Sequence, residues 1–234
     1  MSDKPILRMD AVTVAGATAH ITALTELSYE LNAGELWVVV PERHVDTVSL
    51  YDVASGLIAP DRGTVSFDGE DWQRMGLFDQ SAVRGRISRI FEIEGWVSNL
   101  NIFENIALSQ RHHTTRSDDE LREAIGRLCE RIGLRDCLDE RPHALARGER
   151  RRAQWVRALL GQPDLLLLNA PLLEVRVDDQ AVLFELLAEA RERGTAVMWK
   201  SRDQASWKGQ PGFEDAEIRL LVNGRLERDA RDGA

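Results

Sequence analysis

Three short apolar runs constrain most strongly how this chain can fold. Residues 36–40 and 165–168 are apolar throughout, and residues 195–199 are apolar after an initial threonine. Runs of this length are typical of strands that are buried on both faces, as in a parallel sheet. Helical patterns follow the first run, from Leu50 to Leu57, and the second, from Val182 to Ala190. Buried strands that alternate with helices indicate an α/β fold.

The loop after the first run, residues 41–48, contains neither glycine nor lysine. A phosphate-binding P-loop has the pattern G-x-x-x-x-G-K-[ST], because glycines let backbone N–H groups surround phosphate and lysine neutralises it. The four defining positions fall here on Pro41, Asp46, Thr47 and Val48, and Ser49 follows them. Proline has no N–H, and Asp46 puts a carboxylate where a nucleotide phosphate would lie. We therefore expect Asp46 to be the N-cap of the next helix. An ordinary strand-turn-helix unit is the alternative.

Bulk properties narrow the class of protein. A chain of 234 residues is long enough for one α/β domain with an inserted piece. The net charge of −9 argues against a general nucleic-acid binder. No segment reaches the ~18 apolar residues of a membrane span, and the first residues lack the apolar core of a signal peptide. We expect a cytoplasmic protein in which Cys129 and Cys137 are reduced thiols.

The first part of the chain has antiparallel strand patterns. Alternating residues predict strands at 6–14, 20–31 and 64–67, and a further strand is expected at 87–93. Turn residues at 59–63 separate two of these segments. Such hairpins beside one P-loop-like strand predict two sheets.

From residue 99 to about 160 the pattern is helical. Ser117 and Glu120 form a capping box, and Gly133 marks the end of that helix. The chain ends in a hairpin with the turn Asn223-Gly224. We predict three segments: 1–96 as the β subdomain and first part of the core, 97–160 as a helical subdomain, and 161–234 as the rest of the core with the hairpin.

Two clusters of basic residues need an interpretation. Five arginines crowd one helical stretch, namely Arg147, Arg150, Arg151, Arg152 and Arg157. Taken alone, they are typical of a solvated helix face. His112 and His113 are adjacent, and neighbouring side chains point apart on any regular element, so we expect no metal site there.

The segments 145–152 and 158–171 together resemble the ATP-binding cassette (ABC) family. They carry an LSGGE-type signature, an arginine-rich helix and a Pro-Asp-Leu-Leu-Leu-Leu strand. The resemblance implies a P-loop NTPase-like nucleotide-binding domain with an antiparallel β subdomain and an inserted helical subdomain. It also implies a transporter ATPase subunit, two copies of which close on ATP.

The chain departs from that family pattern at every catalytic position. The magnesium-binding aspartate falls on Asn169, the catalytic glutamate on Ala170, the Q-loop glutamine on Glu92 and the switch histidine on Arg202. The D-loop aspartate falls on Arg176, no aromatic residue is present near Val14 to stack on adenine, and the signature reads Ala146, Arg147, Gly148, Glu149. An amide is a weaker magnesium ligand than a carboxylate, and an alanine cannot polarise water. We expect no ATP hydrolysis and no bound ATP or magnesium cofactor.

The stretch that resembles the family's transporter-docking groove is better kept than the catalytic motifs. It contains Phe91, Asn101, Ile102, Phe103, Asn105 and Ile106. The alternative is that Ile102, Phe103, Ile106 and Leu108 only pack the helical lobe. Residues 58–63, 67–70 and 106–114 are most similar to the cassettes of Mla-type phospholipid transporters.

Three hypotheses follow. The first is a non-catalytic cassette subunit that docks on a membrane permease, pairs with an active cassette, or does both, on the inner face of the cell membrane. The second is a weak or altered nucleotide-binding ATPase in which Arg147 or Arg202 contacts phosphate. The third is a soluble interaction protein that has the same fold but no role in transport.

Overall fold

A six-stranded sheet forms the centre of the molecule. The computed structural model describes residues 4–18, 20–134, 136–201 and 204–229. The sheet has the order β10-β9-β3-β8-β7-β6, and its strands are β3 (Leu36–Pro41), β6 (Ile87–Ile90), β7 (Leu165–Asn169), β8 (Ala196–Lys200), β9 (Glu217–Val222) and β10 (Arg225–Arg228). All neighbours are parallel except β9 and β10. Residues 165–168 and 196–199 are fully buried, as the apolar runs predicted.

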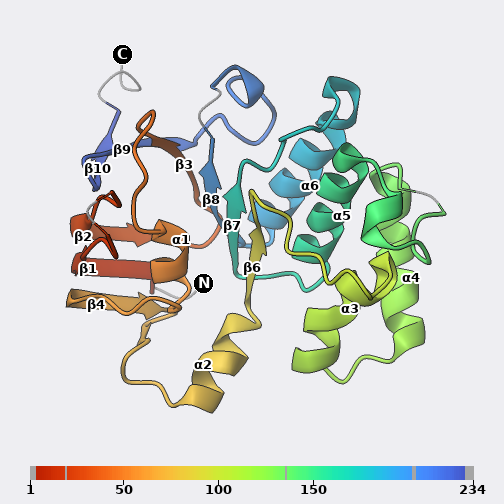
Figure 1. Ribbon diagram of the computed structural model, residues 1–234, viewed down its shortest axis with the longest axis horizontal. Helices are drawn as coiled ribbons and strands as arrows, with labels where there is room; N and C mark the ends of the chain where they lie inside the picture. Colours follow the sequence, from red (N-terminus) through yellow and green to blue (C-terminus); the bar gives the residue numbers. More distant parts are fainter. Residues whose placement is uncertain (1–3, 19, 135, 202–203, 230–234) are drawn as a thin grey trace.

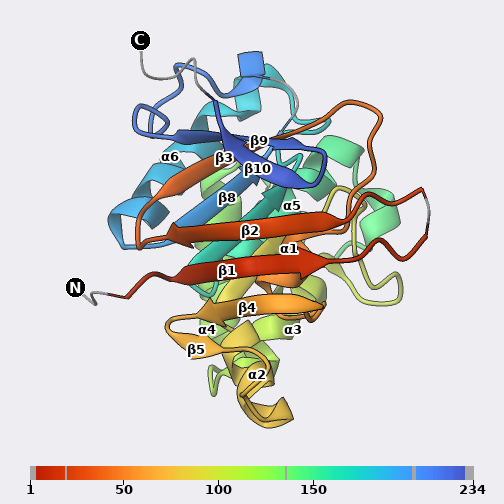
Figure 2. The same ribbon diagram turned by 90° about the vertical axis from the view of Figure 1, so that its left-hand side faces the viewer.

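A second, antiparallel sheet lies against one face of the first (Figures 1 and 2). Its order is β2-β1-β4-β5, and its strands are β1 (Leu7–Val14), β2 (Leu24–Leu31), β4 (Arg62–Phe67) and β5 (Glu70–Asp71). Side chains from both sheets share one apolar cluster with the short helix α1 (Leu50–Ala54). The two predicted sheets are therefore confirmed.

Two predicted elements are shorter than the sequence pattern suggested. The strand expected from residue 20 begins at Leu24, because Ile21 N–H closes a turn on Thr18 O at 3.1 Å. The helix expected to reach Leu57 ends at Ala54, since Gly56 adopts a φ of +66° directly under the Trp72 ring.

Four helices lie on the opposite side of the parallel sheet, namely α3 (Ile102–His113), α4 (Asp118–Arg131), α5 (Arg147–Leu159) and α6 (Ala181–Glu192). Figure 1 shows α5 and α6 next to the sheet, whereas α3 and α4 lie farther out, where both contact α5. The Ser117–Glu120 capping box is present, and Gly133 follows α4 with a φ of +68°. Apolar side chains of all four helices and of the sheet form one continuous cluster. None of the described helices combines the length and the apolar character that crossing a membrane requires.

One helix was absent from the sequence prediction. Helix α2 (Leu77–Arg84) extends away from the antiparallel sheet and buries none of its side chains. It is held by Arg84, whose Nε donates to Ser55 O at 3.1 Å and whose Nη2 donates to Gly56 O at 2.8 Å. Leu77 and Phe78 at its start are 83% and 93% exposed, so the helix lacks the buried apolar stripe by which the other helices were predicted.

The C-terminal hairpin joins the two sheets. Asn223 and Gly224 have φ values of +48° and +72°, which a type I′ turn requires. Gly224 O accepts a hydrogen bond from Thr25 N–H of β2 at 2.9 Å. A Cβ on Gly224 would lie 1.7 Å from Ala23 O, so only glycine fits this contact.

Replacing this glycine tests the junction between the sheets. We expect Gly224→Ala to lower the free energy of unfolding by about 1 kcal/mol through backbone strain and by about 2 kcal/mol more through overlap. Gly209→Ala is the matched control, because Gly209 has a φ of +79° but no atom within 4 Å of an added Cβ. Urea unfolding measures both variants. Equal losses would show that the contact with Ala23 contributes nothing.

Candidate functional site

The carboxyl ends of three parallel strands surround a cavity of about 360 Å³. Pro41 ends β3, Asn169 ends β7 and Lys200 ends β8. The structure thus brings together four predicted positions, Pro41, Glu92, Asn169 and Ala170, at the edge of an α/β sheet where ligands usually bind.

The groups around this cavity limit its chemistry. Ala170, at the position of the catalytic glutamate, offers a methyl group, and its N–H donates to Lys200 O at 2.9 Å. Two carboxylates line the described part of the cavity, those of Glu92 and Glu174. Glu174 is paired with Arg147 at 2.8 Å, which leaves Glu92 as the acidic group of this cavity that forms no ion pair with another described residue. Asn169 contributes a neutral amide where a magnesium ligand would be needed.

The loop between β3 and α1 is held by the protein itself. Thr22 N–H donates to Asp46 O at 2.7 Å, and Val48 N–H donates to Thr22 O at 3.0 Å. These bonds form a parallel bridge between Thr22 and Thr47. The Val48 amide is therefore already used by a protein carbonyl.

The prediction that Asp46 caps the following helix was wrong. Ser49 is the N-cap of α1, and its hydroxyl accepts from Asp52 N–H at 3.2 Å. Asp46 lies three residues earlier, in the extended segment paired with Thr22, and its side chain is exposed. The bridge to Thr22, which is distant in the sequence, sets the conformation of the loop, and the loop sequence contains no sign of that partner.

A second cavity, of about 190 Å³, lies under this loop. Thr47, Ser49 and Asn169 line it together with the cations Arg89 and Lys200. Arg89 pairs with Asp52 at 2.6 Å. The hydroxyl of Tyr51 lies 2.8 Å from Met198 O and 3.2 Å from Leu168 O, and burial raises its pKa well above the ordinary value, so the group stays neutral. Tyr51 thus closes the inner end of the cavity against the strand ends.

The signature segment contacts a loop of its own chain. Ala146 precedes α5, and its N–H donates to the Glu149 carboxylate at 2.8 Å. Arg147 forms its ion pair with Glu174, and a Cβ on Gly148 would lie 2.6 Å from Glu174 O. The residues expected to face a partner's nucleotide are therefore covered in part by the loop after β7.

The arginines of α5 are mostly not a solvated face, which corrects the interpretation of that cluster taken alone. The guanidinium of Arg151 is buried and donates to Phe91 O and to Glu92 O, the latter at 2.9 Å. Arg157 donates to Gly95 O at 3.1 Å and stacks over Trp96, and burial lowers its pKa to about 10. Helical periodicity could not predict these contacts, because the loop carbonyls lie 60 residues away in the sequence.

These contacts also explain a short strand. The strand expected at 87–93 ends at Ile90, because Phe91 N–H donates to the Gln154 side chain at 3.2 Å instead of to a neighbouring strand. Arg150 binds the Glu94 carboxylate. Residues 91–96, which we call the strap, are thus attached to α5 along their length.

Four of the six predicted docking residues lie inside the protein. Ile102, Phe103, Asn105 and Ile106 are each at most 3% exposed, so they pack the helical lobe, which was the alternative interpretation. Asn105 binds the backbone of Val97 through both ends of its amide. Asn101 caps α3, and Phe91 is exposed.

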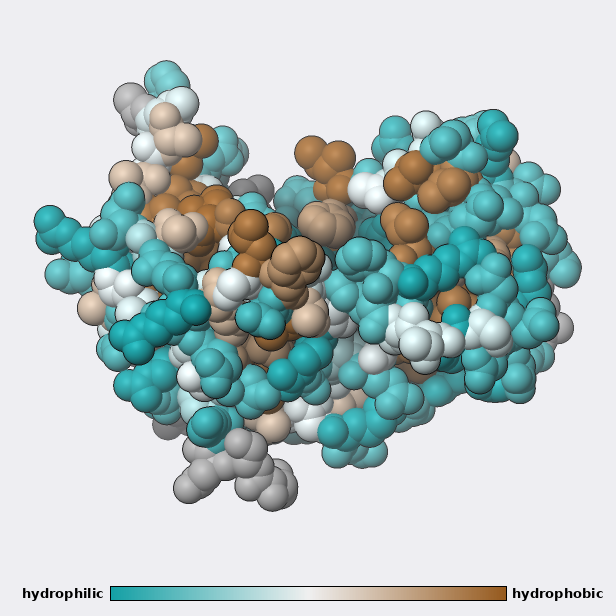
Figure 3. All heavy atoms as spheres, turned by 90° about the horizontal axis from the view of Figure 1, so that it is seen from below, coloured by the Kyte–Doolittle hydropathy of each residue, from teal (hydrophilic) through white to brown (hydrophobic). Residues whose placement is uncertain are grey.

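Other apolar side chains are exposed near the strap. Ile93, Val97 and Leu108 are 86%, 40% and 50% exposed, and Val97 and Leu108 line a groove of about 310 Å³. Figure 3 shows the face on which α2 and α3 lie, with apolar side chains on both sides of a hollow. These apolar residues do not fit the regular apolar spacing of a buried helix face, and this misfit was the sequence signal for the surface.

Two predicted positions stand apart from this arrangement. Arg202 lies outside the described residues. Arg176 precedes a short 3₁₀ turn (Val177–Asp179) with its side chain 80% exposed, near Asp178. Among the described residues, no group of three or more His, Cys, Asp or Glu side chains is placed to hold a metal ion.

Comparison with known proteins identifies the family. The family model described as ABC transporter matches residues 24–172. The chain therefore belongs to the ABC transporter family. The cassette is 29% identical, over 163 residues, to the intermembrane phospholipid transport system ATP-binding protein MlaF of Escherichia coli (strain K12), covering 70% of this chain and 61% of MlaF. It thus spans about three fifths of that relative. Over 206 residues it is 27% identical to the phosphonates import ATP-binding protein PhnC 2 of Synechococcus sp. (strain JA-2-3B'a(2-13)), covering 85% and 76% of the two chains.

Solved structures confirm the predicted fold. The dimeric ATP-binding cassette MJ0796 in a post-hydrolysis state with ADP and Pi superposes with a TM-score of 0.84 at 19% identity, covering 95% of this chain and 97% of that one. The ATP-binding subunit of another ABC transporter gives a TM-score of 0.81 at 19% identity, covering 97% and 90%. The cassette therefore has the P-loop NTPase-like fold with mixed α/β sheets that the sequence predicted.

The attachment of the strap to α5 is testable by mutation. We expect Arg151→Met to lower the free energy of unfolding by about 2–4 kcal/mol, because two loop carbonyls lose a charged donor inside the protein. Arg74→Met is the matched control, since that side chain is 87% exposed, and its effect should stay below about 0.5 kcal/mol. Urea unfolding followed by circular dichroism gives both values. A loss at Arg151 no larger than at Arg74 would contradict this account.

Proposed function

We propose that this cassette is a non-catalytic subunit of an ABC transporter that docks on a membrane permease, pairs with an active cassette, or does both. The observation that carries the proposal is the β3–α1 loop. It has no glycine and no lysine, and the Val48 N–H that a phosphate would need is bonded to Thr22 O. ATP binding at this loop would require that bridge to break.

The strand ends support the same proposal. Asn169 and Ala170 stand where a magnesium ligand and a base would be needed, and the carboxylate of this cavity that forms no ion pair with another described residue is that of Glu92. The phosphate-binding loop, its lysine, the metal ligand and the base act together in phosphoryl transfer. Each of them typically raises the rate by two or more powers of ten. Their joint replacement leaves binding as the function the geometry supports best.

The relatives favour one second candidate. MlaF and PhnC 2 are both named as ATP-binding proteins, so an altered ATP-binding subunit is the competing proposal. The name of MlaF also suggests phospholipid transport as the process served. A soluble protein that kept the fold but left transport is the third candidate, and a membrane partner distinguishes it from the first.

An assay of ATP hydrolysis separates the first two candidates. We expect phosphate release by the purified cassette to stay below about one hundredth of the rate of an intact ABC cassette, with no change in Asn169→Ala or Thr47→Val. Calorimetric titration with MgATP tests binding in the same samples. Hydrolysis or micromolar binding that disappears in either variant would establish the ATP-binding alternative.

Capture of a permease tests the docking role. A tagged cassette should bring down a multi-spanning membrane protein from detergent-solubilised membranes, because exposed apolar side chains gain burial in such a complex. We expect Leu108→Asp to reduce this capture at least about tenfold, while Leu77→Asp, on α2 and outside the groove, leaves it unchanged. Mass spectrometry identifies the partner, and nucleotide content is measured on the same sample. If both variants captured the partner equally, the docking surface would not include Leu108. If no membrane partner were captured at all, the soluble candidate would be favoured.

A further inference from the structure

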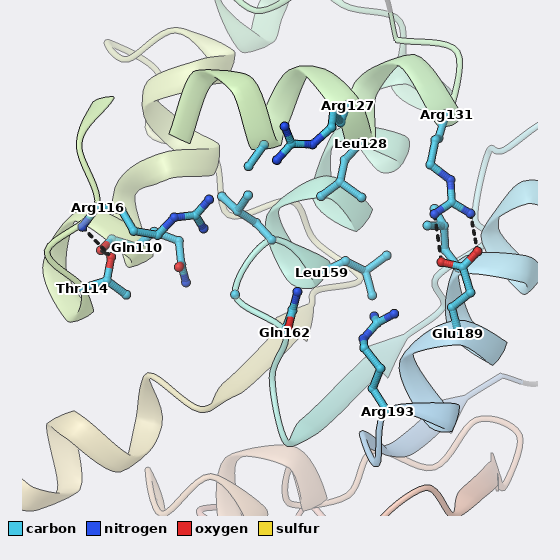
Figure 4. Close-up of a pocket in the computed structure, with 14 residues that line it drawn as sticks. Gln110, Thr114, Arg116, Arg127, Leu128, Arg131, Leu159, Gln162, Glu189 and Arg193 are labelled. Atoms are coloured by element: carbon cyan, nitrogen blue, oxygen red, sulfur yellow. Dashed lines mark hydrogen bonds and ion pairs between the residues drawn. The ribbon is translucent and has the colours of Figure 1, made fainter. Parts of the chain in front are cut away.

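A cavity of about 630 Å³ lies away from the candidate site. It opens between α3, α4, α6 and the end of α5 (Figure 4). Leu159 and Gln162, which precede β7, line it, whereas the candidate site lies where β7 ends. The 13 residues of α5 separate its signature end from this cavity by about 18 Å. We call this space the arginine cleft.

The arginine cleft is positively charged in an otherwise acidic protein. Its lining includes four arginines, Arg116, Arg127, Arg131 and Arg193, and one acidic residue, Glu189. The local formal charge is therefore 4 − 1 = +3, against −9 for the whole chain. An excess of guanidinium groups in a concave, partly apolar site raises the local concentration of anions.

The arginines are not equally available. Glu189 binds Arg131 through both oxygens, one of them at 2.8 Å, so this pair is satisfied. Arg127 pairs with Glu123 on the outer face of α4, where both side chains are more than 60% exposed, and such pairs are weak. The Arg116 guanidinium has only a backbone oxygen at 3.5 Å, and the Arg193 guanidinium makes no hydrogen bond or ion pair with another described side chain, although its charge acts on Glu189. Figure 4 shows the guanidinium groups of Arg116 and Arg193 directed toward the space from different sides.

An amide side chain lines the same space. Gln110 is 8% exposed as a residue, and its side-chain amide makes no hydrogen bond to a described residue. The amide is therefore open to hydrogen bonding with a ligand in the cleft. The floor beside it is apolar, since Leu159, Leu160 and Leu186 are buried there. The cleft thus offers cations at its rim, an unused amide and an apolar floor.

We infer that the arginine cleft binds a phosphorylated small molecule with a planar or apolar body. Guanidinium groups recognise phosphate through paired charge-assisted hydrogen bonds, and the volume lies in the range of small-ligand sites. The arginines converge on one space from the α3–α4 loop, α4 and α6. A peptide would need contacts spread along a line, so this convergence favours a compact ligand. A ligand there would join the helical lobe to α6 of the core.

Calorimetric titration of the full chain with three probes tests the inference. The probes are inorganic pyrophosphate, ADP without magnesium, and dihexanoylphosphatidic acid, and at least one should bind more tightly than about 1 mM. A response to ADP identifies a nucleotide-like ligand, and a response to the short-chain lipid identifies a lipid phosphate. Failure of all three would overturn the inference. Tighter binding of hexaglutamate than of any phosphate probe would also overturn it, in favour of an acidic peptide.

Variants locate the binding and separate it from the candidate nucleotide site. Arg116→Gln and Arg193→Gln should each weaken the responding probe about tenfold, and the double variant more, whereas Arg74→Gln should have no effect. Thermal unfolding checks that all variants remain folded. Binding that is lost in Asn169→Ala but kept in Arg193→Gln would place the phosphate at the strand ends and overturn the cleft site. Ligand binding in the arginine cleft does not depend on the absence of ATP hydrolysis. The cleft inference and the proposed function can therefore be disproved independently of each other.

Discussion

The attachment of the strap to α5 organises the rest of the structure. Residues 91–96 leave the core sheet and enter the helical lobe, and three arginines of α5 bind their backbone or side chains. Charged donors inside a protein make strong hydrogen bonds but are costly when unpaired, so losing the loop carbonyls would destabilise this arrangement. Gln154 adds to it by accepting from Phe91 N–H. Because α5 also packs against the sheet, the helical lobe and the core share one apolar cluster.

A fixed strap determines what stands around the candidate site. It places Glu92 at the edge of the cavity formed by the strand ends, and it presents Ile93 and Val97 to solvent beside Leu108. The strap thus runs from this cavity to the exposed side chain of Ile93.

The sequence predicted those parts of the fold that depend on local pattern. The apolar runs of β7 and β8, the Ser117 capping box and the Asn223-Gly224 turn are set by neighbouring residues, and each is present in the structure. The errors arise where a contact with a residue distant in the sequence determines the local structure. Thr22 draws the Asp46 segment into a bridge, so Ser49 becomes the cap.

The sequence predicted which residues lie at the candidate site, but not which contacts they make. The resemblance placed Pro41, Glu92, Asn169 and Ala170 together, and the structure brings them around one cavity. Periodicity could not show that Ile102 and Ile106 face inward while Ile93 faces solvent, since both surroundings suit an apolar side chain in a short segment. The pairing of Arg147 with Glu174 likewise needed the fold.

The β3–α1 loop shows how the frame of a phosphate site can persist without its ligand. A glycine-rich loop leaves its amides unpaired and depends on an anion to satisfy them. Here Val48 N–H is satisfied by Thr22, α1 is capped by Ser49, and Tyr51 closes the inner end through the strand carbonyls. These contacts are made within the chain, so the loop needs no phosphate to hold its shape. Arg116 and Arg193, which form no ion pair with another described residue, face the cleft at the other end of α5. The arginine cleft, away from the strand ends, is therefore where we infer that a small anionic ligand would act on the cassette.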